Sequence, residues 1–97
     1  MTPFQEKVLT IVKTIPKGRV VTYKYIAQKL NSKAYRAIGS ALKHNPHLIT
    51  IPCHRVIQSD GSIGGYVKGL TKKIKLLESE GIHIQNRKVD LDKFGLK

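Results

Sequence analysis

Residues 22–43 read TYKYIAQKLNSKAYRAIGSALK and contain two helical patterns separated by a few polar residues. The first helix is expected over residues 23–30, with Thr22 as its cap. Its apolar residues share one face: Ile26, Ala27 and Leu30. The second helix is expected over about residues 34–43, with Ser32 as its candidate cap. Two short helices joined by a tight turn are typical of a helix-turn-helix.

The chain upstream of this pair predicts another helix close to the N-terminus. Thr2 can cap it, Pro3 suits the first helical position, and Gln5 completes a capping-box spacing. Apolar residues then recur at helical spacing and would form one buried stripe: Phe4, Val8, Ile11, Val12 and Ile15. A turn at residues 16–18 ends this helix, and residues 20–21 are expected to be extended.

The chain downstream of the pair predicts short extended pieces and loops. Residues 45–46, Asn-Pro, end the second helix, and residues 48–51 are expected to be extended. Residues 56–57 followed by the polar residues 59–62 indicate a small hairpin or a wing turn. Residues 64–66, Gly-Gly-Tyr, are expected to form a flexible loop.

A last helix is expected over residues 70–80, because its apolar residues share a face and Gly81 supplies a stop signal. The polar tail 82–97 contains a few apolar residues and can pack as an extended arm, but its pattern does not place it. We therefore predict a mostly α fold with a short β element, resembling a winged helix-turn-helix, in one domain over residues 1–97.

Charge and cysteine content restrict the class of protein. Eighteen Lys and Arg against six Asp and Glu give a net charge of +12, which favours a polyanionic partner, most often nucleic acid. A generic basic protein is the alternative. A single cysteine excludes an internal disulfide and cysteine-clustered metal sites, and suits a reducing compartment. Without a long apolar run or a signal-peptide pattern, we expect a cytoplasmic protein with no membrane segment.

The single cysteine stands in the segment Pro52-Cys53-His54-Arg55. A thiol is a good nucleophile only as thiolate, and neighbouring positive charge lowers its pKa. A histidine can also take the proton as general base. The alternative is an inert core cysteine among Ile and Val. Adjacent residues of an extended strand point to opposite faces, so Cys53 and His54 need not meet if the segment is extended.

Several segments, taken in order, resemble the C-terminal domain of the O6-alkylguanine-DNA alkyltransferases, a domain that binds DNA and carries the active site. The resemblance covers residues 4–81 and is most specific at the Pro-Cys-His-Arg block with its upstream Asn-Pro. The matching segments are Val21-Thr22-Tyr23, Ile26-Ala27, Arg36-Ala37-Ile38-Gly39, Asn45-Pro46, Ile51 to Ile57, Gly64-Gly65-Tyr66 and Leu76 to Gly81. The fold and function that this family implies are the expectations that follow.

The resemblance implies that Cys53 accepts an alkyl group from O6-alkylguanine in double-stranded DNA and keeps it. His54 would relay the thiol proton through a water, and Glu80 would orient His54. Asn45 would tie the active-site loop, and Tyr23 would donate a proton to the departing guanine. The target atom lies inside the duplex, so the nucleotide must be rotated out. No metal or organic cofactor is implied, and a monomer is expected.

The resemblance also implies a DNA-binding surface and a pocket. Arg36 corresponds to the family's arginine finger, which enters the base stack where the damaged base was. The same helix would approach the minor groove through small and basic residues near this finger: Tyr35, Ala37, Gly39, Ser40 and Lys43. The substrate pocket would be lined by Tyr66, Val56 and Val67. Tyr35 departs from the pattern, because a small residue is common there.

Two rival functions remain open from the sequence. Alkyltransferase-like proteins share this domain and bind alkylated DNA as damage sensors, but another residue stands at the cysteine position. The presence of Cys53 argues against that class. A winged-helix transcription factor would prefer one undamaged sequence and would not need the Cys-His-Arg segment.

Overall fold

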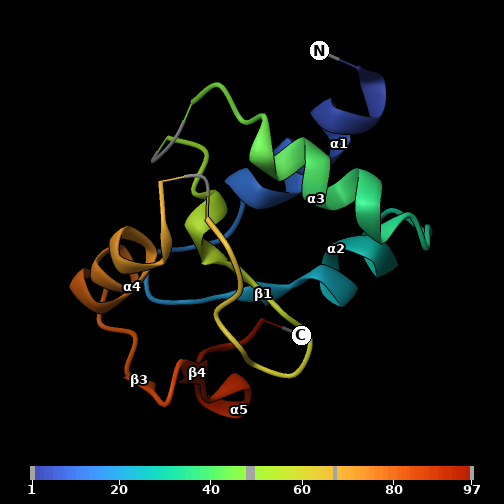
Figure 1. Ribbon diagram of the computed structural model, residues 1–97. Helices are drawn as coiled ribbons and strands as arrows, with labels where there is room; N and C mark the ends of the chain where they lie inside the picture. The colour runs from blue at the N-terminus through green and yellow to red at the C-terminus, as the bar shows by residue number, and fades with distance from the viewer. Residues whose placement is uncertain (1, 48–49, 67, 97) are drawn as a thin grey trace.

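The computed structural model describes residues 2–47, 50–66 and 68–96, and within them the fold is mostly helical with short strands (Figure 1). This agrees with the fold class predicted from the sequence. The elements follow in chain order as α1 Pro3–Lys13, β1 Val21–Thr22, α2 Tyr23–Lys29, α3 Tyr35–Lys43, the 3-10 turn η1 Cys53–Arg55, β2 Val56–Ile57, α4 Leu70–Ser79, β3 Ile84–Gln85, β4 Lys88–Val89 and α5 Leu91–Phe94.

Side-chain caps begin the first two helices as predicted. Thr2 Oγ1 accepts a hydrogen bond from the Gln5 N–H at 3.1 Å, and Thr22 Oγ1 accepts one from the Tyr25 N–H at 3.1 Å. The prediction for Ser32 was wrong, because α3 follows Ala34 and has no side-chain cap. Ser32 Oγ instead accepts from the Ala34 N–H at 3.1 Å, within the turn that precedes the helix.

The strands β1 and β2 pair in parallel and separate two hydrophobic clusters. Val21 lies opposite Val56 in the ladder, and both belong to the cluster formed by α1, α2 and α3. Val20 and Ile57 belong instead to the second cluster, with Leu77 of α4 and apolar residues of the tail. Neighbouring residues of a strand point to opposite faces, so this short ladder contributes side chains to both clusters.

The expected wing turn forms, but it does not close a simple hairpin. Directly after β2, the Gln58 N–H donates to the Ser62 carbonyl at 2.9 Å and closes the turn. Ser62 instead bridges Lys88 of the tail, and the Val89 N–H donates to the Gly61 carbonyl at 2.9 Å. The partner of the wing therefore comes from the tail, which a local hairpin pattern does not reveal.

The tail that sequence reasoning did not place is an ordered part of the fold. Strands β3 and β4 form an antiparallel hairpin, and α5 follows with Asp90 as its cap. The chain then returns to Val20, whose N–H donates to the Phe94 carbonyl at 2.9 Å and whose carbonyl accepts from Leu96 at 2.9 Å. The tail thus covers the second cluster and adjoins the edge of β1.

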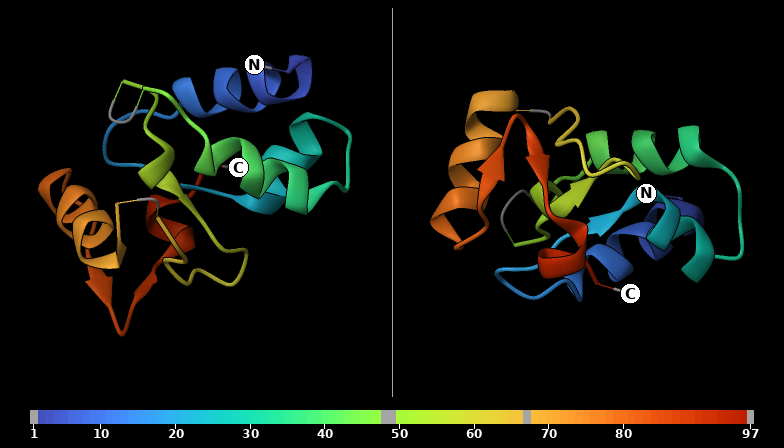
Figure 2. Two further views of the ribbon diagram at one scale, coloured as in Figure 1. Left: turned by 45° about the horizontal axis from the view of Figure 1, so that its top comes forward. Right: turned by 90° about the horizontal axis from the view of Figure 1, so that it is seen from below.

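The two halves of the fold lie on either side of β1. Helices α1, α2 and α3 group together, while α4 and the β3–β4 hairpin lie apart from them in all three views (Figures 1 and 2). Of the extended segment expected at residues 48–51, Leu48 and Ile49 are outside the described residues, and Thr50 lies in a turn. None of the helices in the described ranges has the length and apolar character needed to span a bilayer.

Candidate active site

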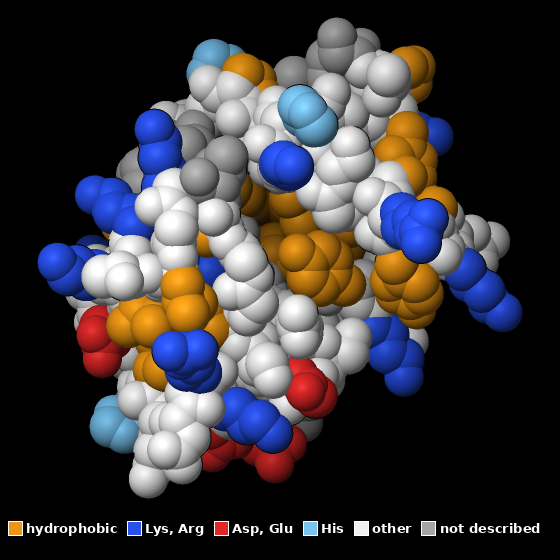
Figure 3. Space-filling view, viewed as in Figure 1, with side chains coloured by type: hydrophobic (Ala, Val, Ile, Leu, Met, Phe, Trp, Pro, Cys, Tyr) orange, Lys and Arg blue, Asp and Glu red, His pale blue; other side chains and the backbone are white. Residues whose placement is uncertain are grey.

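Cys53 lies at the side of an open pocket of about 250 Å³ between helices α2 and α3 on one side and residues 53–66 on the other. Its side chain is only 6% exposed, yet it lines this pocket and is not enclosed by the core. The face seen in Figure 3 is hollowed near its middle, with hydrophobic side chains inside the hollow and basic ones on the surrounding surface. The other lining residues are Tyr23, Gly39, Leu42, Lys43, Val56, Gly65 and Tyr66.

The segment that carries Cys53 is one 3-10 turn and not an extended strand. The Arg55 N–H donates to the Pro52 carbonyl at 2.9 Å, and the Cys53 N–H donates to the Ile51 carbonyl at 2.8 Å. A 3-10 turn has about three residues per turn, so successive side chains point in three directions. Cys53 consequently lines the pocket while its two neighbours extend toward the end of α4.

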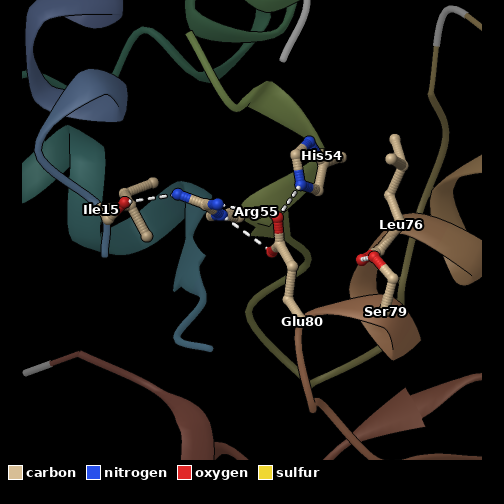
Figure 4. A network of polar contacts seen from close by, with 6 residues as sticks. All are labelled: Ile15, His54, Arg55, Leu76, Ser79 and Glu80. Atoms are coloured by element: carbon tan, nitrogen blue, oxygen red, sulfur yellow. Dashed lines mark hydrogen bonds and ion pairs between the residues drawn. The ribbon is translucent and has the colours of Figure 1, made fainter. Parts of the chain in front are cut away.

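Glu80 is the residue at the C-terminal end of α4, and its carboxylate binds the two residues that follow the cysteine, His54 and Arg55 (Figure 4). His54 Nε2 lies 2.9 Å from Glu80 Oε2, and Arg55 donates to both carboxylate oxygens at 2.9 and 2.7 Å. Arg55 also donates to the Ile15 carbonyl at 2.8 Å, which ties the site to the end of the first helical segment. The sequence indicated Arg55 only as a nearby charge and did not predict this role.

The basic residues next to Cys53, which could lower its thiol pKa through their charge, do not set the direction of the shift. Burial raises the pKa of Cys53 above its usual value, although hydrogen bonding with Asn45 and the positive charge of Lys73 act in the opposite direction. The reason is that His54 and Arg55 direct their polar groups at Glu80. The thiol therefore needs a proton acceptor before it can act as a nucleophile at neutral pH.

His54 has the properties of such an acceptor. It is 1% exposed, and burial lowers its pKa even though the bond to Glu80 raises it. The neutral imidazole donates Nε2–H to the carboxylate, which leaves Nδ1 as a proton acceptor. No described side chain or backbone group hydrogen bonds to this buried Nδ1. Burial raises the pKa of Glu80, but the hydrogen bonds from Arg55 and His54 lower it by more. Its pKa is therefore below the usual value, and the carboxylate stays charged.

The other residues expected around the cysteine lie close to it. Asn45 is buried, donates to the Ile51 carbonyl at 2.8 Å and accepts from the His47 N–H at 2.9 Å, so it ties the loop before the cysteine. Tyr23 and Tyr66 line the pocket. The pKa of each phenol is raised, mainly by burial and to a smaller extent by the charge of the nearby Cys53 thiolate. Both phenols therefore remain donors at neutral pH. Val67 lies outside the described residues.

The residues expected to contact DNA are on α3. Tyr35 is 48% exposed and is the one exposed large hydrophobic residue among those described. Gly39 borders the pocket, and a Cβ added there would meet nothing within 4 Å, so packing within the protein does not require glycine. The remaining expected contacts are exposed: Arg36, Ala37, Ser40 and Lys43.

One buried residue near the site was missed altogether. Lys73 of α4 is 1% exposed, and its ammonium group donates to the Val56 carbonyl at 2.8 Å and to the Gly65 carbonyl at 3.0 Å. The sequence carried a signal, because Lys73 follows Leu70 by three residues and precedes Leu77 by four, on the apolar face of the helix. The described residues contain no cluster of His, Cys, Asp or Glu that could hold a metal ion.

Together these features define a small helix-turn-helix domain. A cysteine beside a His–Glu pair lines its pocket, next to α3, the second helix of the motif. The family model for the DNA binding domain of 6-O-methylguanine DNA methyltransferase matches residues 3–82, and the chain belongs to this family.

Curated relatives carry the name methylated-DNA–protein-cysteine methyltransferase. The protein from Methanothermobacter thermautotrophicus is 43% identical over 86 residues, which are 89% of this chain and 48% of that protein. The protein from Saccharolobus solfataricus is 51% identical over 82 residues, 84% of this chain and 53% of that one. The chain thus spans about half the length of these relatives.

Solved structures show the same fold. OGT of Mycobacterium tuberculosis, solved in complex with DNA, is 43% identical with a TM-score of 0.79, over 82% of this chain and 50% of that one. Atl1 of S. pombe, solved with damaged DNA containing O6-carboxymethylguanine, is 33% identical with a TM-score of 0.86. That match covers 100% of this chain and 97% of Atl1.

Proposed function

We propose that this protein repairs DNA by transferring the alkyl group of O6-alkylguanine to Cys53, once per molecule. One observation carries the proposal: Cys53 lines an open pocket next to an exposed basic helix, while His54 is fixed by Glu80 and its Nδ1 has no hydrogen-bond partner among the described residues. An inert core cysteine would need neither the opening nor the base. The names of the curated relatives and their identity to this chain support the same reaction.

The transfer follows from the chemistry of the lining groups. His54 Nδ1 takes the thiol proton through a bridging water, and the thiolate attacks the alkyl carbon in line with the C–O6 bond. The S–C bond forms as the C–O6 bond breaks, and the bonding electrons stay on the guanine. Tyr23, held as a neutral phenol, donates a proton to the departing base. The thioether is stable, so the acceptor is not regenerated.

Access to the lesion requires DNA binding and rotation of the nucleotide. The partner is double-stranded DNA, bound through α3 with its exposed small residues against the groove and Lys43 at the pocket. Arg36 fills the gap in the stack, which offsets the few kcal/mol that unstacking costs. The protein acts as a monomer in the cytoplasm, where a free thiol stays reduced.

The Cys53→Ala variant tests the assignment of the acceptor. Duplex DNA carrying O6-[³H-methyl]guanine should label the unaltered protein and leave the variant unlabelled. Binding of the variant to the same duplex should stay within about twofold, because the thiol makes no contribution to the α3 surface. Label on the variant would disprove the role of Cys53.

A damage sensor that binds O6-alkylguanine without transfer is the second candidate. The observation in its favour is the shared fold of Atl1, which was solved with damaged DNA containing O6-carboxymethylguanine and matches this chain at 33% identity with a TM-score of 0.86. A sensor would release unchanged O6-methylguanine after prolonged incubation, whereas the proposed reaction leaves plain guanine. Analysis of the nucleosides from the recovered DNA distinguishes the two.

A further inference from the structure

Tyr35, the first residue of α3, has no task in the proposed reaction. Its side chain is 48% exposed, and no other large hydrophobic side chain among the described residues is exposed. Its N–H donates to the Lys33 carbonyl at 2.9 Å, whereas its side chain makes no hydrogen bond or ring contact within the described ranges. Single exposed hydrophobic residues are common on protein surfaces, so a function for Tyr35 depends on its position.

Tyr35 lies on the side of α3 that faces the pocket. Residues separated by about one or two helical turns share a face of a helix. Three residues that follow Tyr35 at such spacings line the pocket: Gly39, Leu42 and Lys43. The side chain of Tyr35 therefore continues this row one helical turn, or about 5.4 Å, before Gly39.

Arg36 is the next residue, but its side chain leaves the helix in another direction. Successive side chains of an α-helix are about 100° apart around the axis. Arg36 therefore lies nearer the outward face, in the row of the exposed Ser40. In the proposed function this outward face enters the groove of the DNA. Arg36 thus extends toward the base pairs, while Tyr35 extends toward the wall of the groove on the pocket side.

The groove wall on the pocket side belongs to the strand that carries the lesion. The extruded nucleotide enters the pocket beside Gly39 and Lys43, so its strand passes along this side of α3. Consecutive nucleotides of one strand are about 3.4 Å apart along the duplex axis. A tyrosine ring one helical turn before the pocket therefore reaches the nucleotide next to the lesion. The sugar of that nucleotide faces the minor groove, where a ribose would present its 2′-hydroxyl group.

We propose that Tyr35 is a specificity-determining residue whose ring packs on the deoxyribose next to the lesion, on the side where α3 begins, and selects deoxyribose over ribose there. The C–H groups of a deoxyribose suit an apolar ring. A 2′-hydroxyl group covered by the ring would lose its water without gaining a hydrogen bond. The proposal rests on the proposed function for the way in which α3 enters the groove, and it does not require that Cys53 reacts.

The test compares the affinity for three duplexes, each with one O6-methylguanine. The lesion strand contains only deoxyribose in the first duplex, one ribonucleotide directly 5′ of the lesion in the second, and one directly 3′ of it in the third. The titrations use Cys53→Ala, so that the lesion is not consumed. We expect about tenfold weaker binding to one ribonucleotide duplex and a change within about twofold for the other, because only one neighbour lies on the side of Tyr35.

Two further changes, each combined with Cys53→Ala, show whether the ring makes the contact. Tyr35→Ala should bind the deoxyribose duplex about fivefold more weakly and bind all three duplexes within about twofold of one another. Tyr35→Phe is the matched control and should keep both the affinity and the preference, because it keeps the ring. The proposal is overturned if Tyr35→Ala keeps the preference, if Tyr35→Phe loses it, or if the protein with Tyr35 binds all three duplexes equally.

The repair function is tested separately, in proteins that keep Cys53. Chloroacetamide alkylates this single cysteine, and the rate, followed by intact mass, should stay within about twofold in Tyr35→Ala because the ring is not part of the pocket wall. If the sugar preference depends on Tyr35 but no methyl group is transferred from O6-methylguanine DNA, the repair function fails and the assignment of Tyr35 stands. Methyl transfer without a sugar preference would support the repair function and overturn the assignment of Tyr35.

Discussion

Helices α3 and α4 serve the same pocket in opposite ways. The nine residues of α3 present an exposed basic surface, and only a few of its side chains border the pocket. The ten residues of α4 place no side chain on the pocket wall, yet Lys73 holds that wall from behind, and Glu80 at the end of the helix binds both neighbours of the cysteine.

The difference between the two helices is the solvent exposure of their charged groups. Exposed cations on α3 are screened by salt and suit contacts with phosphates, where they release counterions. The buried groups near α4 lie in a medium of low polarity, where charges shift pKa values and are costly to leave unpaired. Changes on α3 should therefore alter DNA binding, and changes on α4 should alter thiol chemistry.

The largest effect is expected from Glu80→Gln. The amide has no charge to pair with Arg55, and its NH2 group can donate to His54 Nε2 and so favour the tautomer that carries the proton on Nδ1. We therefore expect about 3 kcal/mol less stability and about a hundredfold slower transfer. Urea unfolding and single-turnover kinetics measure the two. DNA affinity should change little; a large loss of affinity with normal chloroacetamide reactivity would contradict the division between the helices.

The same variant should change how stability depends on pH. The folded pKa of Glu80 is lowered, so its contribution is present at neutral pH and is lost as the pH falls through that folded value. His54 adds to this loss, because its lowered pKa means that the unfolded chain takes up a proton first. The unaltered protein should lose stability steeply below about pH 6. Glu80→Gln should show a shallower loss at the acidic end, and equal slopes would count against a charged Glu80.

A smaller effect, on the use of duplex DNA and not on the thiol, is expected from Arg36→Ala. Losing the side chain that fills the base gap should slow transfer from duplex DNA about ten- to a hundredfold, because a few kcal/mol of unstacking is no longer offset. Reactivity toward chloroacetamide should be unchanged. Arg87→Ala removes the same charge from an exposed position in the β3–β4 hairpin and serves as control. Equal losses in both variants would mean that Arg36 acts only through its charge.

The smallest effect should come from Gly39→Ala. The new methyl group meets no protein atom within 4 Å, so removing glycine from a helix interior should stabilise the fold by about 1 kcal/mol. The same methyl group would stand at the pocket, and we expect about fivefold weaker binding to lesion-containing duplex. A thermal melt and a binding titration measure the two. Stabilisation with unchanged binding would show that α3 does not approach DNA through Gly39.

Local features of the fold could be predicted from the sequence, and the long-range ones could not. Thr2 and Thr22 cap their helices because a cap depends on residues only two or three positions away. The tail pairs with Gly61 and Val20 across long stretches of chain, so its own polar pattern carried no sign of a partner. Ser32 does not cap α3 because the turn before the helix extends to Ala34, two residues beyond the predicted cap.

The candidate site divides in the same way. The chemistry of the single cysteine pointed to the Cys-His-Arg segment, and the resemblance to a family pointed to Glu80. Their arrangement depends on a 3-10 turn, which the alternation of side chains along an extended strand does not predict. The sequence left the direction of the thiol pKa open, and the structure shows that burial raises it while His54 and Arg55 are turned toward Glu80. Lys73 was missed because a lysine on the apolar face of a helix is normally expected to extend its ammonium group into solvent.

The mass of the protein after one round of reaction shows whether Cys53 accepts the alkyl group. The chain is mixed with duplex DNA containing one O6-methylguanine, and a duplex with plain guanine serves as control. We predict a gain of one methylene group per molecule, located on the peptide that contains Cys53, and no gain with the control duplex. An unchanged mass with bound lesion DNA, or a methyl group on any other residue, would contradict it.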